Sequence, residues 1–174
     1  MIKYSRWLLA TFITLLGFSP VFAGTLSTSM GVSATVTPGC TALSTTNLSF
    51  GTVASGNLTK DATATITVTC ALSVPYNVTI DNGLCHPPLA TQRKMAPPGG
   101  CPLILGPTLL DYEIFLDAAH TRRWHDGGFL SGTFRLDAVG NGAAQINTAF
   151  GQVNPTSNTP PGAYSDTVIV FLNF

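Results

Sequence analysis

The residues of this sequence best suited to covalent cross-linking are its four cysteines, Cys40, Cys70, Cys85 and Cys101. An even number of cysteines favours disulfides when a chain is exported to an oxidising compartment. Four cysteines allow three pairings, and we favour Cys40–Cys70 together with Cys85–Cys101. The second bridge would close a short loop that has little core of its own. A bridge over about 15 residues contributes about 3 kcal/mol.

A zinc site is the alternative chemistry for the same region, with Cys85, His86 and Cys101 as ligands. Structural zinc sites space their paired thiols about two to four residues apart. These cysteines lack that spacing. We therefore expect disulfides, and no metal or other cofactor.

The nearest approach to a catalytic group is a cluster of histidines, carboxylates and one tryptophan: Asp117, His120, Trp124, His125 and Asp126. Histidine beside a carboxylate can bind a metal or act as a general base. The same segment, DAAHTRRWHDGG, is typical of a polar turn between two strands, with Arg122 and Arg123 in solvent. We favour the turn. Because nucleophile-elbow, H-E-x-x-H and phosphate-loop motifs are also missing, we expect no enzyme.

The charge composition narrows the class of protein. Only 9% of the 174 residues are charged, with 8 basic and 8 acidic residues, whereas 45% are hydrophobic. Ordinary globular chains carry charge on about a quarter of their residues. So little charge, balanced in sign, excludes a basic nucleic-acid-binding stripe and a charge-driven disordered chain.

The first 23 residues are typical of a secretory signal peptide. Lys3 and Arg6 precede an apolar run over residues 7–18, and Ala23 ends a V-F-A sequence with small residues at the positions that precede cleavage. The alternative is a membrane anchor, but the run is about a dozen residues long and a span needs about 20. We expect export, cleavage after Ala23, and no membrane span in the remaining domain, residues 24–174.

Beyond residue 23 the hydrophobic pattern predicts an all-β protein. Apolar and polar residues alternate between clusters of Gly, Pro and Asn, as in strands joined by turns. The expected strands are 26–36, 47–50, 62–70, 75–80, 109–116, 129–136, 145–150 and 164–174. Such short strands favour a single immunoglobulin-like antiparallel β-sandwich. The last strand is apolar on both faces, which is typical of a strand inside a sandwich and not at an open edge.

Several sequence landmarks occur in a recognisable order after Cys40: LSFG (48–51), ITVTC (66–70), PYNVTIDNG (75–83), LDYEIFLDAAHTRRW (110–124) and PPGAYSDTVIVFLNF (160–174). This set resembles the spore coat protein U domain family, which includes subunits of archaic (Csu-type) chaperone–usher pili. The most specific pieces are Y-x-D-T-V-x-V-x-x-x-F, Y-x-x-x-L-D-A-A and the cysteine pair Cys40 and Cys70. The resemblance covers nearly all of residues 24–174 and implies a Cys40–Cys70 disulfide.

The resemblance implies an immunoglobulin-like sandwich that lacks its last strand. A periplasmic PapD-like chaperone would fill the groove first, and the N-terminal strand of another pilin subunit would then replace it, by donor-strand complementation at an outer-membrane usher. The expected donor strand lies within about residues 24–35, with Leu26, Thr28, Met30, Val32 and Ala34 on one face. The expected acceptor strand is the last one, which no further strand covers, with Val168, Val170, Leu172 and Phe174. The implied function is a structural pilus subunit, exported to the periplasm and then the cell surface, serving adhesion and biofilm formation.

The sequence is also compatible with other assignments. Residues 26–36 are also compatible with an ordinary first strand, and we expect at least the end next to Cys40 to pair within its own domain. The segment 84–107, with Cys85, Cys101 and five prolines before Pro107, departs from the family pattern, and we expect a bridged surface loop. The alternative functions are a spore coat or extracellular matrix protein, a minor tip-proximal adhesin subunit, and a periplasmic metal-binding enzyme.

Overall fold

The computed structural model describes residues 24–56, 58–86, 90–101, 109–126 and 133–174. All regular secondary structure in these ranges is β, in ten strands. No helix among the described residues is long and apolar enough to cross a membrane. The expected signal peptide, residues 1–23, lies outside the described residues.

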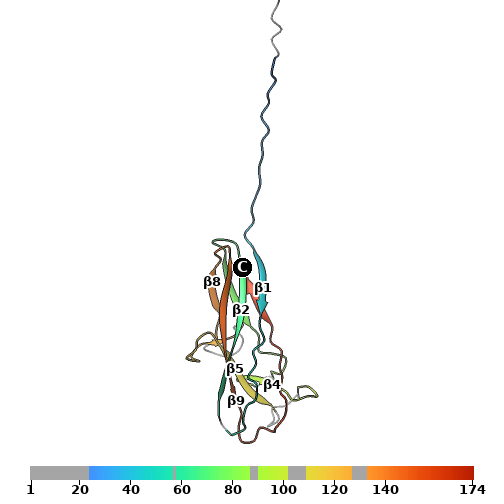
Figure 1. Cartoon of the computed structure of the whole chain (residues 1–174), viewed down its shortest axis with the longest axis vertical. Helices are drawn as coiled ribbons and strands as arrows, with labels where there is room; N and C mark the ends of the chain where they lie inside the picture. Colours follow the sequence, from blue (N-terminus) through green and yellow to red (C-terminus); the bar gives the residue numbers. More distant parts are fainter. Residues whose placement is uncertain (1–23, 57, 87–89, 102–108, 127–132) are drawn as a thin grey trace, which may run out of the picture. The chain divides into compact units, whose positions relative to one another are not determined.

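The larger sheet has seven strands. Its order is β1 (Cys40–Thr45), β2 (Lys60–Cys70), β9 (Ala144–Asn154), β5 (Leu110–Phe115), β6 (Arg123–Trp124) and β7 (Thr133–Phe134), and β4 (Arg93–Met95) also pairs with β5. The long strands β2 and β9 pair over ten residues and lie side by side in Figure 1. All pairs are antiparallel except β6 with β7.

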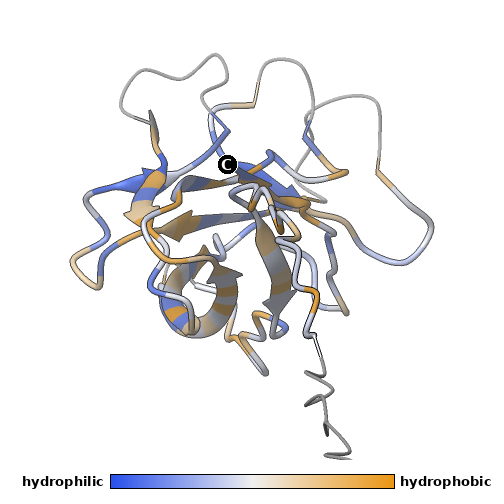
Figure 2. Cartoon of the chain, turned by 90° about the horizontal axis from the view of Figure 1, so that it is seen from above, coloured by the Kyte–Doolittle hydropathy of each residue, from blue (hydrophilic) through white to orange (hydrophobic). Residues whose placement is uncertain are grey.

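The smaller sheet has three antiparallel strands in the order β10 (Val170–Asn173), β3 (Pro75–Ile80) and β8 (Leu136–Val139). The inner faces of the two sheets share one hydrophobic core, which includes Ile66 and Val68 of β2 and Val78 and Ile80 of β3. Hydrophobic and hydrophilic colours alternate along the strands in Figure 2, as they do when one face of each strand is buried. The predicted all-β antiparallel sandwich is therefore confirmed.

The N-terminal expectation needs a correction. Residues 24–39 contain no strand, and each of residues 24–38 is exposed. The first strand begins at Cys40, after the end of the expected strand 26–36. A β-strand forms only when its backbone groups pair with another strand. The alternating pattern of 26–36 is compatible with a strand, but the pattern does not provide the partner strand.

Other differences follow from tertiary packing. Residues 47–50 are extended but unpaired, and the expected strand 164–174 is shortened to β10 plus an isolated bridge between Ala96 and Ser165. The segment 84–107 is more than a surface loop, because β4 lies in it and the Arg93 side chain is fully buried. The expected strand 129–136 lies partly outside the described residues.

The polar turn expected around residues 117–128 is only half correct. Asp117 does organise a turn, because its carboxylate accepts hydrogen bonds from the backbone N–H groups of Thr121 and Arg122 at 3.1 and 2.7 Å. Farther along the segment, however, Trp124 and His125 are buried. The Trp124 indole N–H donates to the carbonyl of Val78 at 2.9 Å. Because this hydrogen bond satisfies the indole N–H inside the core, Trp124 is buried although its neighbours in the sequence are polar.

Candidate functional site

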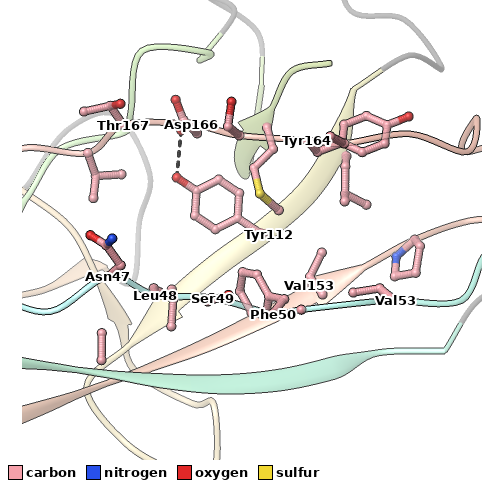
Figure 3. A pocket seen from close by; sticks show the side chains of 18 of the residues that line it. Asn47, Leu48, Ser49, Phe50, Val53, Tyr112, Val153, Tyr164, Asp166 and Thr167 are labelled. Carbon is pink, nitrogen blue, oxygen red and sulfur yellow. Dashed lines mark hydrogen bonds between the residues drawn. The ribbon is translucent and has the colours of Figure 1, made fainter. Parts of the chain in front are cut away.

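A cleft with a volume of about 980 Å³ lies between two extended segments of the sandwich. Residues 45–53 continue from the end of β1 and form the first wall, and residues 163–170 run up to the start of β10 and form the second wall. The floor consists of core side chains from both sheets: Ala64, Ile66, Ile80, Leu110, Tyr112, Ala149 and Val153. Figure 3 shows the two walls with Tyr112 pointing between them.

The first wall crosses the inner face of the larger sheet. Leu48 packs over Gly151 of β9, where a Cβ atom would lie only 2.5 Å from Leu48 Cδ2, so glycine provides the space that Leu48 occupies. Phe50 meets the ring of Tyr112 edge-on, with centroids 6.4 Å apart. These contacts explain why the segment leaves the edge of the sheet after β1 and does not continue as a strand.

The second wall has a free backbone edge. The N–H of Ile169 donates to Asp81 Oδ1 at 2.8 Å, and its carbonyl accepts from the N–H of Asp81 at 3.0 Å. Backbone groups of successive residues in an extended chain point to opposite sides. The N–H and C=O groups of Val168 and Val170 therefore point away from Asp81, toward the cleft. Among the described strands, β10 pairs with β3 alone, so this edge stays open.

The side chains along this edge are apolar on both faces. Val168, Val170 and Leu172 are half-buried against the core, whereas Ile169 and Phe171 on the opposite face are 50% and 44% exposed. Half-buried apolar side chains beside an unpaired edge make a surface to which another strand adds favourably. The cleft therefore offers both requirements of strand addition, backbone partners and apolar sockets.

A polar contact joins the floor to the second wall. The Tyr112 hydroxyl donates to Asp166 Oδ2 at 2.7 Å, and Asp166 Oδ1 accepts from the N–H of Cys85 at 3.1 Å (Figure 3). Burial and this hydrogen bond raise the pKa of Tyr112 above its ordinary value. The phenol therefore remains a hydrogen-bond donor and holds the second wall over the floor.

The comparison with protein families decides what kind of domain this is, since the Spore Coat Protein U domain matches residues 26–171. The chain belongs to the Spore Coat Protein U domain family. The resemblance drawn from the sequence motifs is confirmed. The match includes both walls of the cleft and the strands that form its floor.

A solved structure agrees with this assignment. The chain is similar, with 25% identity and a TM-score of 0.55, to a chain in the crystal structure of the CsuC–CsuE chaperone–tip adhesion subunit pre-assembly complex from archaic chaperone–usher Csu pili of Acinetobacter baumannii. The similarity covers 80% of this chain but only 40% of the other, so this chain spans less than half the length of its structural neighbour. It supports the expected immunoglobulin-like fold. No curated protein sequence matches the chain.

The structure places the residues expected at the acceptor strand in different positions. Val168 and Val170 line the cleft, and Leu172 packs against the core beyond it. Phe174 lies after the end of β10 and is 67% exposed. Of the four expected residues, Val168 and Val170 therefore lie at the open edge of the cleft, whereas Phe174 does not.

The expected donor residues lie in the exposed N-terminal segment. Leu26, Met30 and Val32 are almost completely exposed, and Thr28 and Ala34 are exposed as well. Large apolar side chains are rarely exposed together without a partner. This segment therefore has the apolar side chains that a cleft of this kind could bind.

The four cysteines form the two pairings favoured from the sequence. Cys40 and Cys70 face each other across β1 and β2, and Cys85 is bonded to Cys101. Sulfur atoms in a disulfide cannot serve as thiolate ligands, which removes the basis for a zinc site at Cys85, His86 and Cys101. The described residues contain no group of three or more His, Cys, Asp and Glu residues arranged to hold a metal.

The two histidines of the catalytic alternative have structural partners. His120 packs on the ring of Phe115, with centroids 4.9 Å apart, and its Nδ1 lies 3.2 Å from Gln152 Nε2. His125 lies in a buried cluster, with its Nε2 3.2 Å from Glu113 Oε1. Arg93 bonds the same carboxylate oxygen of Glu113 and also donates to the carbonyl of Trp124 at 2.6 Å. The cluster ties β4, β5 and β6 together beneath the sandwich surface.

The sequence pattern predicts neither the first wall nor the contact of Tyr112 with Asp166. Both residues stand in the motifs that carried the family resemblance, one in Y-x-x-x-L-D-A-A and the other in Y-x-D-T-V. The sequence does contain one signal, which is the acidic residue Asp166 inside an otherwise apolar C-terminal pattern. A carboxylate that faces inward needs a buried hydrogen-bond donor.

Proposed function

We propose that this chain is a structural subunit of a chaperone–usher surface pilus and that its cleft binds a β-strand from a neighbouring subunit. The observation that carries the proposal is the open backbone edge at Val168 and Val170 above an apolar floor. An added strand would pair with this edge and cover the floor, which completes the immunoglobulin-like sandwich. Family membership and the similarity to a chain of a chaperone–subunit complex of Csu pili support the same function.

The neighbouring subunit supplies the strand from about residues 24–35. Leu26, Thr28, Met30, Val32 and Ala34 recur at every second position, so all five face the same side of an extended segment. Burial of each larger apolar side chain contributes about 1.5–3 kcal/mol. Backbone hydrogen bonds add to this and fix the register, because a shift by one residue would point the serines into the cleft.

The route to the surface follows from this assembly. Residues 1–23 direct export and are removed after Ala23, and residues 24–174 enter the periplasm as the pilin domain. A PapD-like chaperone occupies the cleft there until the usher at the outer membrane exchanges it for the donor strand of the next subunit. The resulting fibre serves adhesion and biofilm formation.

The two faces of the donor segment provide the experiment. Met30→Asp with Val32→Asp places two charges on the apolar face, and Ser29→Asp with Ser33→Asp places the same charges on the opposite face as a matched control. We expect the first pair to abolish polymers that resist dissociation and the control pair to retain them. Size-exclusion chromatography and unheated gel electrophoresis of the periplasmic fraction measure both.

Equal polymer yields from the two pairs would contradict the proposal, since only one face of the segment is meant to enter the cleft. Polymers that survive with Met30→Asp and Val32→Asp would show that another surface joins the subunits.

A further inference from the structure

The loop closed by Cys85–Cys101 lies against the second wall of the cleft, on the side away from the open edge. The N–H of Ala96 donates to the carbonyl of Ser165 and the N–H of Ser165 donates to the carbonyl of Ala96, both at 2.9 Å. The N–H of Leu84 donates to the carbonyl of Thr167 at 3.0 Å. A further bond runs from the N–H of Cys85 to Asp166 Oδ1 at 3.1 Å. Four hydrogen bonds thus hold three consecutive wall residues.

These bonds determine which backbone groups remain for a partner. Ser165, Thr167 and Ile169 direct their backbone groups to residues 81–96, so the alternation leaves those of Asp166, Val168 and Val170 for the cleft. The loop therefore pairs with one backbone edge of the second wall, as β3 pairs with one edge of β10. Without it, Ser165 would lose its backbone partner Ala96 and Asp166 would lose the bond from Cys85, which leaves Leu84 and Asp81 as the remaining backbone partners of this wall.

The loop is itself anchored in the core. Arg93 of β4 is fully buried and donates to the carbonyls of Ile80 and Asp81 at 3.1 and 2.8 Å. Cys85 and Ala96 form a small buried cluster with Leu109. The disulfide thus joins Cys85, whose N–H bonds Asp166, to Cys101, which follows Ala96 in the loop. Ala96 in turn bonds Ser165.

We propose that the Cys85–Cys101 loop preorganises the cleft for its donor strand. The inference rests on the proposed function and assigns a role to the one segment that departs from the family pattern. An edge already held extended does not have to be ordered when the donor binds, so more of the interaction free energy appears as affinity. Cys85 and Cys101 are positioning residues, because they act on the donor strand through Ser165, Asp166 and Thr167.

The test compares two full-length variants that each lack one disulfide. Cys85→Ser with Cys101→Ser removes the bond behind the second wall, and Cys40→Ser with Cys70→Ser removes the bond between β1 and β2 as a matched control. The readouts are amide hydrogen exchange at Leu84, Ala96 and Ser165, and dissociation of a labelled synthetic peptide of residues 24–38.

We expect the Cys85 and Cys101 variant to exchange these amides about tenfold faster and to release the peptide about tenfold faster than the wild-type chain. The Cys40 and Cys70 variant lowers the unfolding midpoint but leaves both rates near the wild-type values. Asp166→Asn, which keeps both disulfides and weakens the acceptor for the N–H of Cys85, gives an intermediate rate of release and provides the same test if the cysteine variants do not fold.

The outcomes separate the two claims. Suppose that the wild-type chain binds the peptide, but that the Cys85 and Cys101 variant or the Asp166→Asn variant releases it at the wild-type rate. This result overturns the preorganisation and leaves the proposed function standing. A wild-type chain that does not bind the peptide overturns the proposed function, and this inference with it.

Discussion

The hydroxyl of Tyr112 lies 2.7 Å from Asp166 Oδ2 and connects the floor of the cleft to its second wall. The two residues come from strand β5 and from the segment before β10, which are 54 residues apart in the sequence. Asp166 also requires a glycine beside it, because a Cβ at position 83 would lie 2.0 Å from Asp166 Oδ2. One carboxylate thus fixes the distance between the floor, the wall and the Cys85–Cys101 loop.

Tyr112→Phe tests the contribution of this contact to stability. The substitution removes the donor to a carboxylate oxygen, so we expect the free energy of unfolding to fall by about 1–2 kcal/mol. Tyr164→Phe is the matched control, because the Tyr164 hydroxyl donates to the neutral carbonyl of Pro160 at 2.7 Å in a solvent-exposed hydrogen bond. Urea denaturation measures both, and equal losses would show that Asp166 contributes nothing beyond an ordinary surface bond.

The same tyrosine gives a prediction at alkaline pH. Its pKa is raised above the ordinary value of 10.0, chiefly by burial and then by the bond to Asp166. The folded chain therefore keeps this proton while the unfolded chain loses it above pH 10.0. The free energy of unfolding should then fall by up to about 1.4 kcal/mol per pH unit above that point. The wild-type curve minus the Tyr112→Phe curve isolates this contribution, and a difference independent of pH would contradict it.

The buried cluster around Glu113 makes the opposite prediction at acid pH. Burial raises the pKa of this carboxyl, but the hydrogen bond with His125 and the charge of Arg93 outweigh burial and lower it below 4.5. The folded chain therefore binds the proton more weakly than the unfolded chain. This stabilisation is complete above pH 4.5 and is lost as the pH falls through the lower folded-state pKa.

Glu113→Gln removes the charge partner of a fully buried arginine, so we expect a loss of about 3–5 kcal/mol at neutral pH. The variant should also lack part of the acid transition of the wild-type chain, as followed by Trp124 fluorescence. Arg135→Gln is the control, since Arg135 pairs with Asp137 at 2.8 Å where both side chains are exposed, and a comparable loss there would contradict the role of burial.

The sequence predicted those elements whose own pattern determines them. Residues 75–80 were predicted as a strand with the bounds of β3, and β2 and β5 differ from their predictions by two residues or fewer at each end. Their alternation is strong because one face of each strand packs in the core. β4 was missed because it lies among prolines and is held by Arg93, whose buried partners come from other parts of the chain.

The candidate site was predictable only in part for the same reason. The apolar alternation of Val168 and Val170 indicated the second wall. The position of the first wall depends on the space above Gly151 and on the ring of Tyr112. A glycine in a strand indicates a close approach by another group, but the sequence does not identify that group. The role of Asp166 depends on a partner 54 residues away, which periodicity along the chain cannot reveal.

The packing of Leu48 over Gly151 gives a prediction for the first wall. Gly151→Ala places a Cβ 2.5 Å from Leu48 Cδ2, so we expect a loss of about 1–3 kcal/mol from overpacking. Leu48→Ala should also destabilise the fold, but the double variant should lose less than the sum of the two single losses. Thermal unfolding of the four chains measures this coupling, and strictly additive losses would show that the two residues do not share the site.

The open edge itself is tested by neighbouring residues of β10. Val170 is half-buried, packs against the core and lines the cleft, whereas Phe171 is 44% exposed on the opposite face. Val170→Asp places a charge where the donor strand would cover it, so we expect the labelled peptide of residues 24–38 to bind at least about tenfold more weakly. Phe171→Asp leaves the cleft face intact and should bind the peptide as the wild-type chain does. Circular dichroism establishes that both variants are folded, and a weaker affinity for Phe171→Asp than for Val170→Asp would place the docking surface on the other face of β10.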